Sequence, residues 1–209
     1  MTNREFLKTE TFRALNLMLE KYNYKLLKSK DSFILKTDFG WNKYSIDFFL
    51  RDIGWTILPA LLVRFEVVEN LYHKISDFEK KYQKGTPTIG TTIENFDVTL
   101  EARFDLYEES QINSVVEKLF ELFENVALPF FGKFSNLSAI DEQLNYNIND
   151  TTLTGGIFKG TKSLIIGKLM KRNDFDELER VYQSYYISFA DGFYLPEYLR
   201  LKELLKSNA

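Results

Sequence analysis

The strongest pattern in the chain lies between Phe96 and Leu106, where apolar and polar residues alternate without a break. Because successive side chains of a β-strand point to opposite faces, this alternation predicts a long strand with one buried and one solvent-facing side. Such a strand is typical of an antiparallel sheet that is covered by other elements on one face only. The run therefore favours a fold in which a sheet packs against helices.

Three further segments predict strands, over residues 32–37, 43–51 and 55–65. The short segment 38–42 between the first two predicts a turn, so these two strands should form an antiparallel hairpin. Pro59 lies inside the third segment and cannot donate a hydrogen bond to a neighbouring strand. We therefore expect the third strand to be interrupted or to lie at an edge of the sheet.

Helical spacing of apolar residues appears on both sides of these strands and throughout the last third of the chain. Asp174 and Glu177 predict a capping box, Pro196 a helix start, and Pro129 a helix end. The predicted helices cover a first segment that ends near Asn23, then residues 68–82, 112–127, 137–144, 163–172, 174–186 and 196–205.

Together these elements predict an α+β fold, in which an antiparallel sheet packs against helices and the C-terminal part is mainly helical. We expect a single domain over residues 1–209. The polar, glycine-containing connection 145–156 could hold a short strand at 151–154 and is the best candidate for an internal boundary. It would divide the chain into a sheet-and-helix core, 1–146, and a helical part, 147–209.

Composition limits the function classes. The net charge is −3, from 27 basic and 30 acidic side chains, which argues against a nucleic-acid partner. The chain has no cysteine, which excludes disulfides and thiolate chemistry and fits a reducing compartment. No segment has the pattern of a signal peptide or of a membrane span, so we expect a cytoplasmic protein that does not bind membranes. Composition leaves the oligomeric state open.

The segment Gly155–Ser163 is similar in position to a phosphate-binding loop, between a predicted strand and a predicted helix. A phosphate-binding loop needs lysine directly after its second glycine, and here Thr161 intervenes. We therefore expect a turn at Gly155 and Gly156 followed by a helix that Thr161 or Ser163 caps. An anion held at that helix N-terminus is the alternative. The candidate anion-binding residues are Lys159, Gly160, Lys162 and Ser163.

The sequence contains no catalytic signature and implies no cofactor. His73 is the only histidine, and its position on the predicted helix 68–82 points away from the apolar stripe, which predicts a surface residue. Asp97, Glu101 and Asp105 share the polar face of the predicted strand 96–106. A carboxylate site for acid–base chemistry or a hard cation could use them, but a solvated sheet face gives the same pattern. We assign no metal site and no catalytic residue.

Several aromatic residues fall outside the predicted apolar stripes and could anchor a protein interface. They form two clusters, one just after the predicted helix 112–127 and one before the last helix. The alternative is that both clusters close the core over helix ends. The candidate binding residues are Phe130, Phe131, Phe134, Phe193 and Tyr194, with the acidic residues Asp97, Glu101 and Asp105.

The layout of the chain resembles small bacterial domains, some of which are similar to immunity proteins of toxin systems. The resemblance rests on the order of elements and on four segments. They are Gly40-Trp41-Asn42, Arg51-Asp52-Ile53-Gly54, Lys171 to Glu177 and Gly192 to Glu197. It implies a cytoplasmic protein of bacterial origin that binds another protein, covers its active surface and has no catalytic residues. The alternatives are a regulatory interaction module and a small enzyme that uses carboxylate or lysine chemistry.

Overall fold

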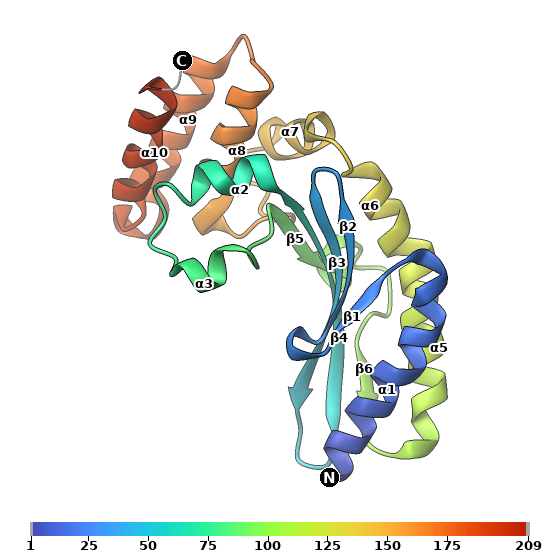
Figure 1. Cartoon of the computed structure of the whole chain (residues 1–209). Helices are drawn as coiled ribbons and strands as arrows, with labels where there is room; N and C mark the ends of the chain where they lie inside the picture. The colour runs from blue at the N-terminus through green and yellow to red at the C-terminus, as the bar shows by residue number, and fades with distance from the viewer. Residues whose placement is uncertain (1, 208–209) are drawn as a thin grey trace. The chain divides into compact units, whose positions relative to one another are not determined.

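The computed structural model describes residues 2–207 and confirms the predicted α+β class (Figure 1). The chain forms two compact units, each built from two segments. Unit 1 comprises Met1–Val63 and Gly90–Gly132, and unit 2 comprises Arg64–Ile89 and Lys133–Ala209. The subdivision predicted after residue 146 does not coincide with any of these boundaries.

The sheet lies mainly in unit 1 and has six strands in the order β1-β2-β3-β4-β5, with β6 also paired to β4. The paired neighbours whose register is known are antiparallel. The strands are β1 Lys25–Leu27, β2 Ser32–Thr37, β3 Gly40–Leu50, β4 Trp55–Phe65, β5 Ile89–Thr92 and β6 Phe104–Leu106. The predicted hairpin is confirmed, with a turn shorter than expected because Gly40 already pairs with Thr37.

Pro59 does not interrupt β4, and β4 does not lie at an edge of the sheet, so both forms of the prediction were wrong. β4 is continuous and central, between β3 and β5. On one side, however, β6 pairs only with Trp55–Ile57, and Gly90 of β5 lies against Leu61. Pro59 falls between these two partners, where a missing backbone donor costs least.

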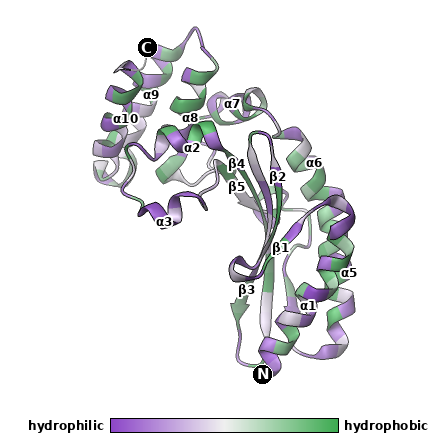
Figure 2. Cartoon of the chain, in the orientation of Figure 1, coloured by the Kyte–Doolittle hydropathy of each residue, from purple (hydrophilic) through white to green (hydrophobic). Residues whose placement is uncertain are grey.

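Two helices of unit 1 pack against each other beside the sheet, α1 Asn3–Leu19 and α5 Ile112–Leu122 (Figure 1). Figure 2 shows both hydrophobic and hydrophilic residues along each helix, as amphipathic spacing predicts. Phe12 of α1 contacts Phe33 of β2, and Tyr44 of β3 donates a hydrogen bond to the carbonyl of Leu119 in α5. The core of unit 1 therefore lies between this helix pair and the sheet.

Pro129 does not end the predicted helix, because a π-helical turn at Phe123–Ala127 connects α5 to α6 Leu128–Lys133. In that turn the N–H of Leu128 bonds to the carbonyl of Phe123, five residues back. In an ordinary α-helix the ring of Pro129 would clash with the carbonyl four residues earlier. The wider turn accommodates the proline, and the helix continues.

The prediction of a long strand at 96–106 was wrong. Residues Ile93–Phe96 form the short helix α4, and only Phe104–Leu106 are a strand. The Thr92 hydroxyl caps α4 by accepting from the N–H of Asn95, and the Asp97 carboxylate accepts both the N–H and the hydroxyl of Thr99. These local bonds compete successfully with a β-ladder.

Unit 2 is mainly helical, which confirms the predicted character of the C-terminal part. Its helices are α2 Glu66–Tyr72, α3 Lys80–Gln83, α7 Leu137–Tyr146, α8 Gly156–Leu169, α9 Phe175–Ser188 and α10 Leu195–Ser207. The predicted helix 68–82 is two short helices instead, and residues 151–154 form a turn rather than a strand. Asp174 caps α9 without the predicted capping box, because its carboxylate binds Arg172.

Helix α8 lies at the centre of unit 2 and is buried from Lys159 to Gly167. It contacts α2, α7, α9 and α10. A Cβ atom at Gly160 would lie 2.5 Å from the ring of Tyr186, and one at Gly167 would lie 2.8 Å from Leu178. Gly160 and Gly167 thus let α9 approach α8 closely. The turn expected at Gly155 and Gly156 is replaced by the start of α8, with Gly155 as its N-cap.

Within residues 2–207, no helix combines the length and the apolar character that crossing a bilayer requires.

Gly160→Ala should destabilise the protein by about 1–3 kcal/mol, because the new methyl group overpacks the buried contact with Tyr186. Gly132→Ala is the matched control. Nothing lies within 4 Å of a Cβ atom at Gly132, on helix α6, so this change should be neutral or raise stability by up to about 1 kcal/mol. Urea unfolding of both variants measures the difference, and equal effects at the two positions would contradict the packing argument.

Candidate functional site

The candidate anion-binding residues Lys159, Gly160, Lys162 and Ser163 lie inside helix α8 and not at its N-terminus, which is Gly156. Their amides therefore belong to the body of a buried helix. The prediction that Thr161 or Ser163 caps this helix was wrong, because the helix already begins at Gly156. The alternative, an anion held by free amides at these residues, fails for the same reason. The two lysines nevertheless stand out, since both are buried.

Lys159 and Ser163 are four residues apart, on one side of α8. Among the described residues, the Lys159 ammonium has no hydrogen-bond partner, whereas the Ser163 hydroxyl interacts with that of Tyr182, and both residues are 0% exposed. Burial lowers the pKa of Lys159 to about 8, and the charge of Asp150 opposes this shift. The pair has the residue types of a serine–lysine dyad, but it is enclosed in the helical layer of unit 2.

Lys162 belongs to a buried ionic cluster centred on Glu69 of α2, which is 0% exposed. The Lys162 ammonium lies 3.1 Å from Oε1 of Glu69 and also donates to the carbonyl of Pro87. The hydroxyls of Thr86 and Thr88 donate to the same carboxylate at 2.7 and 3.1 Å. Burial lowers the pKa of Lys162, and the charge of Glu69 opposes that effect.

Arg64, which is 2% exposed, supplies the second buried cation of the cluster. Its Nη1 lies 3.8 Å from Glu69 and donates to the carbonyls of Gln83 and Thr86. Its Nε and Nη2 bind both oxygens of Glu66, a half-exposed carboxylate. The cluster therefore balances two cations, Arg64 and Lys162, with two anions.

His73 is part of this cluster, so the prediction of a surface residue was wrong. Its side chain is 6% exposed, and its Nε2 and Nδ1 lie 2.7 Å from the Thr86 hydroxyl and 2.8 Å from the Ser76 hydroxyl. The Thr86 hydroxyl already donates its proton to Glu69, so it can only accept a hydrogen bond from the imidazole. A neutral ring meets this requirement when its proton is on Nε2. Burial lowers the pKa of His73, which favours this neutral form, although Glu69 opposes the shift.

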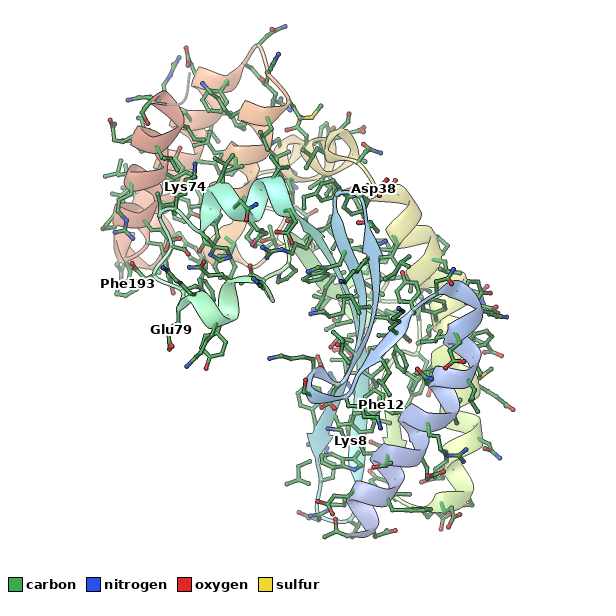
Figure 3. The ribbon with its side chains drawn as sticks, in the orientation of Figure 1. Lys8, Phe12, Asp38, Lys74, Glu79 and Phe193 are labelled. Atoms are coloured by element: carbon green, nitrogen blue, oxygen red, sulfur yellow. The ribbon has the colours of Figure 1, made fainter. Side chains whose placement is uncertain are left out.

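The aromatic cluster at Phe130, Phe131 and Phe134 is buried, with at most 3% exposure for each residue. It cannot form the predicted binding surface as it stands. Phe130 packs edge-on against Phe96, so the cluster closes the core. Phe193, in unit 2 and labelled in Figure 3, is 76% exposed. Its ring packs edge-on against that of Tyr194.

The three candidate carboxylates do not form the predicted ladder on one strand. Asp97 is engaged by Thr99, whereas Glu101 and Asp105 are exposed. Glu101 lines a recess of about 300 Å³ between α5 and the stretch before β6, which we call the acidic recess. Its apolar floor includes Leu100, Phe104, Leu122 and Val126, and its polar lining includes Glu101, Glu121 and Lys118.

The acidic recess has two carboxylates that form no ion pair within the described residues, although Lys118 also lines it. Glu101 and Glu121 are both exposed, and neither forms an ion pair with another residue in the described range. The Lys118 ammonium instead lies 5.4 Å from the centre of the Phe104 ring. An aliphatic floor under free carboxylates can accept a long cationic side chain, whose methylene groups cover the floor.

Over residues 2–207, the structure contains no group of three or more His, Cys, Asp or Glu side chains arranged to hold a metal ion. Comparison of the chain with protein-family models, with curated proteins and with solved structures found no match. The function must therefore be argued from the surfaces and clusters of this chain alone.

Glu69→Gln should lower the free energy of unfolding by about 3–5 kcal/mol, because it leaves Lys162 and Arg64 buried without their central anion. Glu66→Gln removes a half-exposed partner of the same arginine and should cost at most about 1 kcal/mol. Chemical denaturation of the two variants checks the difference. Similar losses from both would show that the buried charge balance does not hold unit 2 together.

Lys159→Met should stabilise the protein at pH 7 by about 1–4 kcal/mol, because an apolar side chain of similar length replaces a buried, unpartnered cation. The folded-state pKa of Lys159, about 8, lies below that of an unfolded lysine, about 10.4, so wild-type stability rises as the pH increases between these values. The advantage of Lys159→Met should therefore shrink over this pH range.

Lys162→Met is the matched control for that measurement. It removes a lysine from the same helix but leaves Glu69 without its closest cation, so it should destabilise the protein. Thermal or urea unfolding at several pH values measures whether each variant is more or less stable than the wild type. A Lys159→Met variant less stable than the wild type at pH 7 would contradict the assignment of Lys159 as an uncompensated buried charge.

Proposed function

We propose that the chain is a non-catalytic protein-binding or inhibitory protein of the immunity type, which covers a cationic surface of its partner with the acidic recess. The observation that carries this proposal is the pair of unpaired carboxylates, Glu101 and Glu121, above an apolar floor. A lysine or arginine of the partner would place its charge between them and its methylene groups on the floor. Arginine is a frequent anchor in protein interfaces.

Two further observations support a binding role over the enzymatic alternative. The side chains best suited to lysine or carboxylate chemistry, Lys159 and Glu69, are both 0% exposed. The Glu69 carboxylate is also fully engaged by two hydroxyls and Lys162, and a catalytic acid or base must be within reach of its substrate. We further propose a cytoplasmic location, which a cysteine-free composition favours.

The proposal is tested by charge reversal at the recess. The wild type, the double variant Glu101→Lys with Glu121→Lys, and a control are immobilised and exposed to native lysate from the source organism. The control, Asp38→Lys with Glu142→Lys, makes the same change in net charge at two exposed acidic residues away from the recess. We expect one protein to be retained by the wild type and the control, and about tenfold less of it by the recess variant.

Circular dichroism and thermal unfolding must first show that all three proteins are folded. Cross-linking followed by mass spectrometry should then connect the retained protein to residues around Glu101 and Glu121. Retention of the same proteins by the recess variant, or retention of none by the wild type, would contradict the proposal.

A further inference from the structure

A second recess in unit 1 lies between α1 and the start of the sheet, with a volume of about 530 Å³, and we call it the basic groove. Helix α1 lines it from Glu5 to Leu17, and Leu26, Lys28 and Asp31 line it from the other side. Phe12 and Leu26 provide apolar floor, and Leu17 beside them is 64% exposed. Leu17 therefore adds exposed apolar surface at the border of the groove.

The basic groove runs beside an open edge of the sheet. β1 is the first strand in the sheet order and pairs with β2 alone, so half of its backbone N–H and C=O groups point away from the sheet. Between Glu5 and Asn16, helix α1 spans about 16 Å along the groove. An extended segment of about five residues has the same length. β1 itself has three residues, Lys25–Leu27, so an added strand would pair with the sheet over that length and continue along α1 in the groove.

The charged residues around β1 determine which charge a segment bound at this edge should carry. Lys25, Lys28 and Lys30 are exposed, and none forms an ion pair or a side-chain hydrogen bond with a described residue. Two acidic residues line the groove, and both are engaged: Asp31 is paired with Lys8 at 2.5 Å, and Glu5 accepts from the N–H of Thr2. Figure 3 labels Lys8 and Phe12 of the groove. Lysines on an edge strand repel a basic strand that approaches it. A neutral strand would not repel them, but it would leave the charge of the lysines unbalanced. An acidic segment is the complement of this edge.

We propose that the basic groove binds an extended, acidic segment of a partner protein, which adds to β1 as a further strand. Alternate side chains of the segment would lie against Phe12, Leu17 and Leu26, and its carboxylates would meet the lysines of β1 and of the turn that follows. This site is distinct from the acidic recess, because it takes the opposite charge and uses none of the same residues.

The test uses peptides of about seven residues that alternate glutamate with valine or leucine, titrated into the full-length protein and followed by NMR. A second peptide has lysine in place of glutamate. A third keeps the glutamates but carries N-methyl groups on alternate amides, which removes the donors of one strand edge. The acidic peptide should shift the amide resonances of Lys25–Leu27 and of the groove face of α1, and the other two should bind about tenfold more weakly.

Charge reversal supplies the matched variants. Lys25→Glu with Lys28→Glu should weaken binding of the acidic peptide by about tenfold, whereas Lys74→Glu with Lys80→Glu, at exposed lysines of unit 2, should leave it unchanged. Equal binding of the acidic and basic peptides, shifts confined to other elements, or no binding at millimolar peptide would overturn the proposal. The acidic recess is intact in all of these variants, so these outcomes are independent of the function proposed above.

Discussion

Unit 2 depends on the buried charge of Glu69. This residue comes from the first of the two chain segments in the unit, and Lys162, which neutralises it at 3.1 Å, comes from the second. A buried ion has to be balanced within the protein, so the two segments can pack only where both charges meet. Arg64 extends the same network to the carbonyls of Gln83 and Thr86 and thus fixes the loop that leads into β5. The specific arrangement of unit 2 is therefore set by polar contacts as well as by apolar burial.

The parts of the fold that could be predicted are those in which the local pattern and the tertiary environment agree. The segments 32–37 and 55–65 are strands over the predicted residues, because both are strong apolar runs, and the second begins directly after the bend at 52–54. The run 96–106 has a strong alternation of apolar and polar residues, but the strand predicted from it does not form. Side-chain hydrogen bonds from Thr92 and Asp97 redirect its backbone, and the alternation survives only as buried Ala102, Phe104 and Leu106. In the first half of the run the predicted burial fails as well, because Val98 is 87% exposed.

The ionic cluster could not be predicted, because its members are far apart in the sequence and each has an ordinary local setting. His73 was placed on the surface by counting along a helix that was assumed to continue to residue 82. The helix ends at Tyr72, and the imidazole turns toward Ser76 and Thr86 instead. One signal was available for α8: glycines at 156, 160 and 167 lie at helical spacing beside apolar residues. That pattern is typical of a helix packed closely on its neighbours.

The net charge of the chain does not reveal how acidic and basic residues are separated on the surface of unit 1. A total of −3 describes a nearly balanced chain, but in unit 1 the carboxylates Glu101 and Glu121 lie beside α5, and Lys25, Lys28 and Lys30 lie in and just after β1. Charges that are separated in this way create local fields that their sum does not reveal. A partner with a uniformly charged surface can complement only one of the two recesses and is repelled by the other. The two proposed sites are therefore separate, because a segment whose charge complements the acidic recess has the wrong charge for the basic groove.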